Sequence, residues 1–271
     1  MRIDPNLSEW LNLFARWLHV FAGILWVGTT YYFTWLDARL SEAEAGMQAG
    51  EQPQVWMVHS GGFYVVNKRK TPGAETLHWF RWEAALTWLG GMILLVLVYY
   101  MGGALVDPDV CDISVAAATL YSLGLLVVGW LIYDLLMLSP LGKNEVAFAV
   151  VAYALLVGVA YHLTHVLSGR AAYIHMGALL GTLMVANVWM HILPAQRRMI
   201  AATRAGQTPD AALAARAKLR SKQNTYMVVP VVFTMISNHF PTATYGSRYN
   251  WIILSILILV GWLAAKLIRR A

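Results

Sequence analysis

The sequence predicts an all-α fold, a polytopic bundle of membrane-spanning helices. Of the 271 residues, 59% are hydrophobic and only 13% are charged, whereas a soluble domain carries about 25% charged residues. The apolar residues form long runs, and about 20 such residues suffice for a helix to cross a bilayer. The 12 Trp and 13 Tyr residues suit the two lipid–water interfaces, where these rings are enriched.

Seven apolar runs predict about seven transmembrane helices. They lie at residues 10–36, 84–106, 114–138, 144–168, 171–193, 225–241 and 249–268. The sixth run is the shortest and contains Pro230. We expect a single integral membrane domain over residues 1–271, with long polar loops at 37–83 and 194–224. The second loop is rich in Ala, Arg and Lys, which is compatible with an interfacial helix.

The basic residues predict the orientation of the bundle. With seven spans, the two long polar loops, the turn at 139–143 and the C-terminus share one side. Only four of the 20 Lys and Arg residues lie in the rest of the chain, namely Arg2, Arg16, Arg170 and Arg248. Because such an excess marks the cytoplasm, we expect the N-terminus outside and the C-terminus inside the bacterial inner membrane. Basic residues that flank apolar spans argue against a nucleic-acid partner.

Histidines in the spans are the first candidate functional residues. Five of the eight lie in or near the predicted outer half of the membrane, namely His19, His162, His165, His175 and His239. Ionisable residues inside a membrane usually face the interior of the bundle, and imidazole is a common axial ligand of haem. These two facts suggest a membrane haem b, whose iron the histidines would ligate.

His19 and His175 are the preferred pair of axial ligands. Gly23 lies four residues after His19, and Ala178 and Gly181 follow His175 at helical spacing, so each histidine shares a helix face with small residues. Small residues allow a flat macrocycle to approach the backbone, but they also line ordinary helix–helix contacts. His162, His165 and His239 are the alternates. His162 and His165 share a face that suits a metal ion, although a structural role is favoured for that pair.

The predicted cytoplasmic loop 37–83 contains the candidate substrate site. His59 precedes the paired glycines Gly61 and Gly62 and the aromatic residues Phe63 and Tyr64. Paired glycines allow backbone N–H groups to approach a ligand, and aromatic rings stack on planar molecules. The sequence therefore favours ligand binding at this segment.

Two further groups of polar residues lie near the predicted cytoplasmic ends of the helices. His78, Arg81 and Glu83 precede the second span, and guanidinium groups bind planar anions well. Asn187 lies four residues before His191, and its amide suits either ring recognition or helix–helix hydrogen bonding. For Asp134 we favour a structural role, such as pairing with Lys143, over proton relay.

Four of these segments resemble a known family. They are VHSGGFY at 58–64, LHWFRWE at 77–83, LSGRAAYIHMGA at 167–178 and ISNHFP at 236–241. Together they resemble the membrane domain of bacterial urate oxidases of the cytochrome-c-fused type. The resemblance implies oxidation of urate to 5-hydroxyisourate, with electrons passed through membrane haem to a periplasmic cytochrome c. This chain has no CxxCH motif and hence no cytochrome c domain, so we expect a separate cytochrome c as the acceptor.

Under this hypothesis, His59, His78 and Arg81 are catalytic. Arg81 would neutralise the urate anion, and His59 or His78 would act as general base. Gly61, Gly62, Phe63, Tyr64, Glu83 and Asn187 are the predicted substrate-binding residues. Two alternatives remain open, namely a b-type cytochrome subunit without its own substrate site and a transporter of purines or metals.

Overall fold

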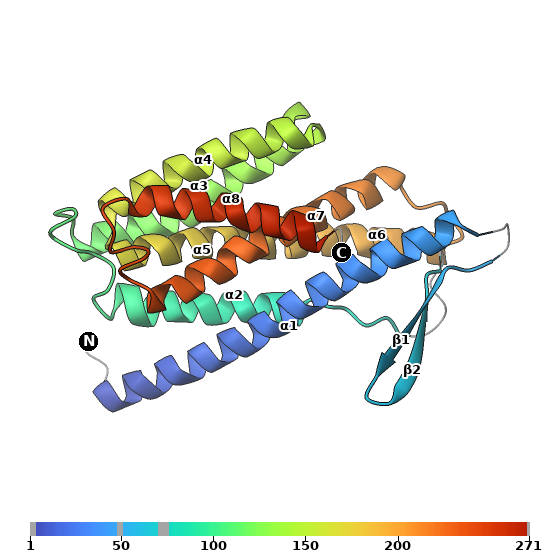
Figure 1. Cartoon of the computed structure of the whole chain (residues 1–271), viewed down its shortest axis with the longest axis horizontal. Helices are drawn as coiled ribbons and strands as arrows, with labels where there is room; N and C mark the ends of the chain where they lie inside the picture. Colours follow the sequence, from blue (N-terminus) through green and yellow to red (C-terminus); the bar gives the residue numbers. More distant parts are fainter. Residues whose placement is uncertain (1–3, 48–50, 70–75, 270–271) are drawn as a thin grey trace.

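The computed structural model describes residues 4–47, 51–69 and 76–269, so Arg2 and parts of the predicted loop 37–83 lie outside the described residues. Long helices run along one another, and a small β-hairpin projects from one end of the bundle (Figure 1). The α-helices are α1 (Pro5–Ala45), α2 (Trp82–Leu94), α3 (Val115–Leu138), α4 (Glu145–Val166), α5 (Gly169–Ala186), α6 (Leu193–Arg204), α7 (Ala211–Ile236) and α8 (Asn250–Ile268). We call the end of the bundle that carries the hairpin and α6 the hairpin end.

Shorter helical segments extend or join these helices. Two π-helices continue α2 and α5, namely η1 (Leu95–Tyr100) and η3 (Asn187–Ile192), and two 3₁₀ helices are η2 (Pro140–Lys143) and η4 (Ser237–His239). Side-chain oxygens cap the N-termini of five α-helices by accepting a backbone N–H bond; they belong to Asp4, Ser114, Asn144, Ser168 and Asp210. Such caps satisfy donors that the first helical turn leaves free.

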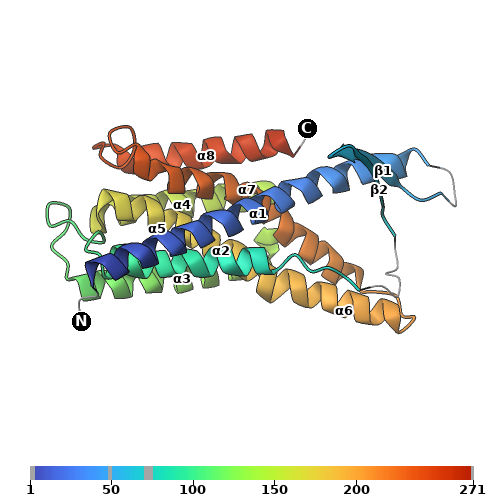
Figure 2. The same cartoon turned by 90° about the horizontal axis from the view of Figure 1, so that it is seen from below.

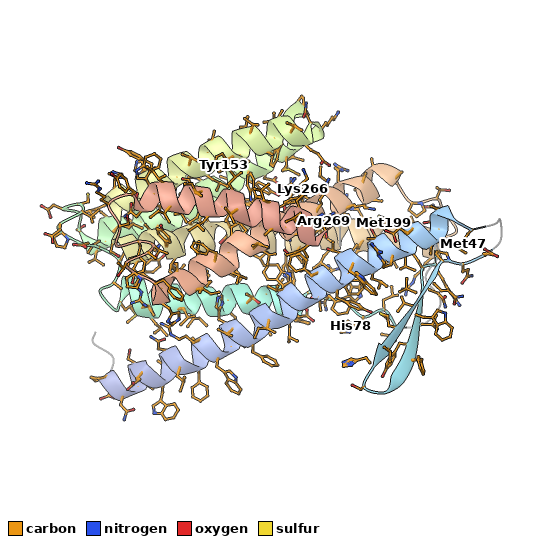
Figure 3. All side chains as sticks on the ribbon, viewed as in Figure 1. Met47, His78, Tyr153, Met199, Lys266 and Arg269 are labelled. Atoms are coloured by element: carbon orange, nitrogen blue, oxygen red, sulfur yellow. The ribbon has the colours of Figure 1, made fainter. Side chains whose placement is uncertain are left out.

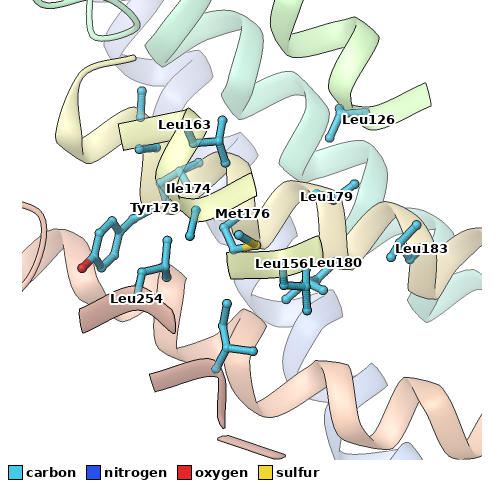
Figure 4. Close-up of a cluster of buried hydrophobic side chains, with 14 of the residues drawn as sticks. Leu126, Leu156, Leu163, Tyr173, Ile174, Met176, Leu179, Leu180, Leu183 and Leu254 are labelled. Carbon is cyan, nitrogen blue, oxygen red and sulfur yellow. The ribbon is translucent and has the colours of Figure 1, made fainter. Parts of the chain in front are cut away.

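Helix α5 is the centre of the bundle. It contacts α2, α3, α4 and α7, and its Tyr173 and Met176 are completely buried. Figure 4 shows these side chains among leucines from neighbouring helices. A Cβ at Gly177 would collide with the hydroxyl of Thr234 on α7, so this glycine allows the two helices to lie in close contact.

The prediction of an all-α helical bundle is confirmed, with a β-hairpin as an addition. Six helices of the described ranges are long and apolar enough to cross a membrane, namely Pro5–Ala45, Trp82–Tyr100, Val115–Leu138, Glu145–Val166, Gly169–Arg204 and Asn250–Ile268. They are compatible with a multi-pass membrane protein. The predicted span 225–241 corresponds to the second half of α7, whose first half is charged, and the helix ends at Ile236. The count of seven spans and their orientation stay predictions.

The hairpin occupies part of the segment that the sequence suggested was a loop. Strands β1 (Gln54–His59) and β2 (Gly62–Asn67) pair antiparallel. The turn residues Ser60 and Gly61 both have positive φ, 48° and 77°, as type I′ hairpins require. Lys68 anchors the hairpin to α1 through a 2.8 Å ion pair with Asp37. Asp37 also lies 3.3 Å from Lys218 on α7.

Candidate functional site

A buried polar network lies where η3 meets α3 and α7. Asn187, the first residue of η3, is only 1% exposed. Its amide nitrogen donates to Tyr133 Oη and to Asn224 Oδ1, both at 2.9 Å. Asn224 in turn donates to the Met184 carbonyl at 3.1 Å. π-Helices often occur at functional sites, and here the π-helix contributes the central amide of the network.

Arg220 of α7 completes this network. It is 4% exposed, and its Nη1 donates to Asn187 Oδ1 at 3.0 Å while its Nη2 donates to Asp134 Oδ1 at 2.6 Å. The guanidinium also lies over the Tyr133 ring, 5.3 Å from the centroid. Asp134 is the charged partner that the buried guanidinium needs, because an unpaired buried charge is strongly unfavourable.

His191 joins the network through the same carboxylate oxygen. Its Nε2 lies 2.7 Å from Asp134 Oδ1, without the alignment of a hydrogen bond. Asp134 therefore contacts Arg220 and His191 together, and not Lys143, the partner considered from the sequence. An imidazole beside a carboxylate is a common arrangement for accepting a proton.

A cavity of about 190 Å³ borders the network. Met137 and Leu138 of α3 line it together with residues of η3, α6 and α7. Its polar lining residues are His191, Arg198, Arg216 and Arg220. Figure 2 shows α6 and the first half of α7 diverging from the other helices at the hairpin end, where this cavity lies. The arrangement is suited to binding a small anion.

The structure places the predicted hairpin residues at the surface. His59 is exposed beside the turn, with its Nδ1 3.1 Å from Ser60 Oγ. Phe63 is 80% exposed and Tyr64 53% exposed, while Gly61 and Gly62 form the turn and the first position of β2. Among the described residues, no hydrogen bond, ion pair or ring contact joins His59 to His78 or Arg81.

The predicted residues His78, Arg81 and Glu83 lie at the start of α2. His78 is exposed (Figure 3) and contacts the Phe80 ring edge-on. Arg81 Nε and Glu83 Oε2 are buried without a hydrogen-bond partner in the described part of the chain. The adjacent Trp82 contacts Trp189 of η3, with ring centroids 5.9 Å apart. No hydrogen bond or ion pair among the described residues joins His78, Arg81 or Glu83 to the network, so the structure brings only part of the predicted site together.

His175 lies in the half of the bundle away from the hairpin, and one of its ring nitrogens has no hydrogen-bond partner among the described residues. It is completely buried, and its Nδ1 donates to the Ala171 carbonyl at 2.7 Å. Its Nε2 is buried and has no partner among the described residues. The rings of Tyr99 and Tyr100 lie 5.8 and 6.5 Å away. Metal-ligating histidines typically donate one ring N–H to a carbonyl and present the other nitrogen, so the donor pattern of His175 would allow it to ligate a haem iron.

His19 has the same donor pattern on α1. Its Nδ1 donates to the Thr87 carbonyl of α2 at 2.7 Å. The ring lies against Gly91, where an added Cβ would come within 3.0 Å of His19 Cε1. The donor pattern of His19 would therefore also allow it to ligate a haem iron.

The alternate histidines are less enclosed. His162, His165 and His239 are all exposed. His162 Nδ1 lies 3.0 Å from Tyr121 Oη, and His165 donates to the Tyr161 carbonyl at 2.6 Å. The described ranges contain no group of three or more His, Cys, Asp or Glu residues placed to hold a metal ion.

Two of the motifs quoted from the sequence meet near His175. Arg170, one residue after the start of α5, donates to Asn238 Oδ1 at 3.0 Å, and its guanidinium lies 6.0 Å from the Tyr99 ring centroid.

Sequence reasoning missed other polar residues of the hairpin end, namely Tyr133, Arg198, Arg216, Arg220 and Asn224. The one available signal was that Arg220 and Asn224 are a helical turn apart at the border of a predicted span.

Long apolar helices that enclose a polar network and a buried imidazole define an all-α bundle that is compatible with a multi-pass membrane protein. A family comparison makes this class more specific. Residues 5–270 match the family described as urate oxidase N-terminal, and the chain therefore belongs to this family. Neither the curated proteins nor the solved structures contain a match to the chain.

Proposed function

We propose that this protein is a membrane oxidoreductase that converts urate to 5-hydroxyisourate at a cytoplasm-facing site. The observation that carries the proposal is membership of the urate oxidase N-terminal family over residues 5–270. The resemblance of four separate segments, noted from the sequence, points to the same reaction.

The reaction needs water and an electron acceptor. One water adds its oxygen to C5 of urate, and the product leaves with two electrons and two protons removed from urate and water together. We propose that the electrons pass through membrane haem b to a separate periplasmic cytochrome c. Two molecules of ferric cytochrome c would be reduced for each urate, because each haem iron accepts one electron.

Buried His175 and half-buried His19 support the haem part of the proposal. His175 presents an unpartnered Nε2 inside the bundle, and His19 donates its Nδ1–H to a carbonyl, which keeps its other nitrogen available. When bound, haem b supplies a one-electron carrier between the substrate and the outer face. The protein's own contribution is to orient both imidazoles through the carbonyls of Ala171 and Thr87.

The same histidines favour a second candidate, a b-type cytochrome subunit without its own substrate site. This candidate predicts a haem protein that a partner or a quinol reduces and that urate leaves oxidised. The two functions therefore differ in one observable, which is electron transfer from urate itself.

An anaerobic turnover assay tests the proposed reaction. Purified protein in detergent is mixed with urate and ferric cytochrome c, and both urate loss and cytochrome reduction are followed. We expect two cytochromes reduced per urate consumed and no reduction with xanthine, which lacks the 8-oxo group. Cytochrome that stays oxidised while urate is unchanged would contradict the proposal.

A further inference from the structure

We infer that the cavity between η3, α6 and α7 is the binding site for the planar oxopurine anion. This inference rests on the proposed function for the identity of the anion. It moves the substrate site from the exposed hairpin turn around His59 to the buried network around Arg220.

Positive charge is arranged along the depth of the cavity. Arg198 of α6 and Arg216 of α7 are exposed, whereas Arg220 is buried one helical turn after Arg216. No carboxylate is among the described residues that line the cavity. A recess lined by one sign of charge raises the local concentration of the opposite ion, so this cavity favours a small anion entering from the hairpin end.

The Arg220 guanidinium is held in a fixed orientation. One of its N–H groups is bound by Asn187 and another by Asp134, and an arginine has five N–H donors in total. Donors that remain free can bind the oxygen and ring nitrogen of a planar anion as a fork. His191 also lines the cavity next to Asp134, so it is placed to accept a proton from a ring N–H.

The walls and the size of the cavity suit a flat ring. Met137, Leu138, Met190 and Pro194 are among its apolar lining residues. The volume of about 190 Å³ is smaller than the roughly 300–1,000 Å³ typical of pockets for drug-sized ligands. A bicyclic purine between apolar walls, with arginines at its edge, matches this combination.

Arginine-to-glutamine substitutions at the cavity mouth test the inference. Arg198→Gln and Arg216→Gln remove charge from exposed positions, so the fold is expected to persist. Arg204→Gln is the matched control, because Arg204 is an exposed arginine of α6 outside the cavity lining. Equilibrium dialysis with labelled urate measures binding by the full chain in detergent under anaerobic conditions, and turnover gives KM and kcat.

We expect urate binding to weaken about tenfold for each cavity arginine, the loss of roughly one charged hydrogen bond. KM should rise in parallel, while the Arg204→Gln variant should bind urate as the unmodified protein does. Unchanged urate binding in the Arg198→Gln/Arg216→Gln double variant would overturn the inference. The same holds if His59→Ala, rather than the double variant, abolishes binding.

The outcomes separate this inference from the proposed reaction. If the unmodified protein binds urate without oxidising it, and the double variant loses binding, the cavity assignment stands and the proposed reaction fails. If oxidation proceeds with an unchanged KM in the double variant, the reaction stands and the cavity assignment fails. If the double variant loses phosphatidylglycerol that co-purifies with the unmodified protein, and still binds urate unchanged, the cavity binds a lipid headgroup. This result would overturn the inference.

Discussion

Arg220 is the residue on which the polar network depends most. Removing its guanidinium leaves the Asp134 carboxylate and the Asn187 carbonyl oxygen without their shared donor. Asp134 is only 17% exposed, so water replaces the lost partner poorly. We expect Arg220→Met to lower the free energy of unfolding by about 3 kcal/mol, measured by titration with a denaturing detergent.

A charge-neutral pair provides the control for this substitution. The double variant Asp134→Asn/Arg220→Met removes both charges and should recover part of the lost stability, since no unpaired carboxylate remains. If the single and double variants are equally stable, the unpaired Asp134 carboxylate is not what destabilises Arg220→Met, and this explanation of the loss is wrong.

The sequence predicts individual polar residues of the network better than it predicts which residues they contact. Asn187 and Asp134 stood out as polar residues at the ends of apolar runs. Their partner Arg220 lies 33 and 86 residues away along the chain, and hydropathy carries no information on such distant pairs. Their contact follows from the packing of α7 against η3 and α3.

Helices α5 and α7 pack in close contact at Gly177. Gly177 faces the Thr234 hydroxyl, and an added Cβ has no space there, whereas a Cβ at Gly181 meets nothing within 4 Å. We expect Gly177→Ala to cost about 1–3 kcal/mol through overpacking. Gly181→Ala on the same helix should be neutral or stabilising, because alanine favours helix more than glycine does.

Thermal unfolding of the two glycine variants in detergent measures this difference. A Gly177→Ala variant as stable as Gly181→Ala would show that α5 and α7 are not in the close contact described. His175 lies two residues before Gly177, so the same packing also fixes the position of the buried imidazole.

Element boundaries show where hydropathy succeeds and where it fails. The apolar runs located α3, α4 and α8 closely, because these helices are apolar on all sides. Helix α1 continues to Ala45 through charged residues that apolarity does not detect, stabilised by a 3.0 Å ion pair between Arg39 and Glu42. The paired glycines of the hairpin turn favour a loop, and hydropathy does not detect the short strands beside them.

The hairpin end of the bundle is predicted to lie in the cytoplasm. The single cysteine allows a direct test, because Cys111 lies in the loop between η1 and α3 at the other end. A membrane-impermeant maleimide should label Cys111 in intact spheroplasts. In a Cys111→Ser background, Gln207→Cys, between α6 and α7, should be labelled only after lysis. The reverse pattern of labelling would contradict the predicted orientation.

We propose that urate delivers electrons to a haem held by His19 and His175. The anaerobic visible spectrum of the purified, haem-replete protein before and after addition of urate tests this proposal. We expect a Soret band that shifts to the reduced position with urate and that is lost in His175→Ala. A colourless protein, or a haem that dithionite reduces and urate does not, would contradict it.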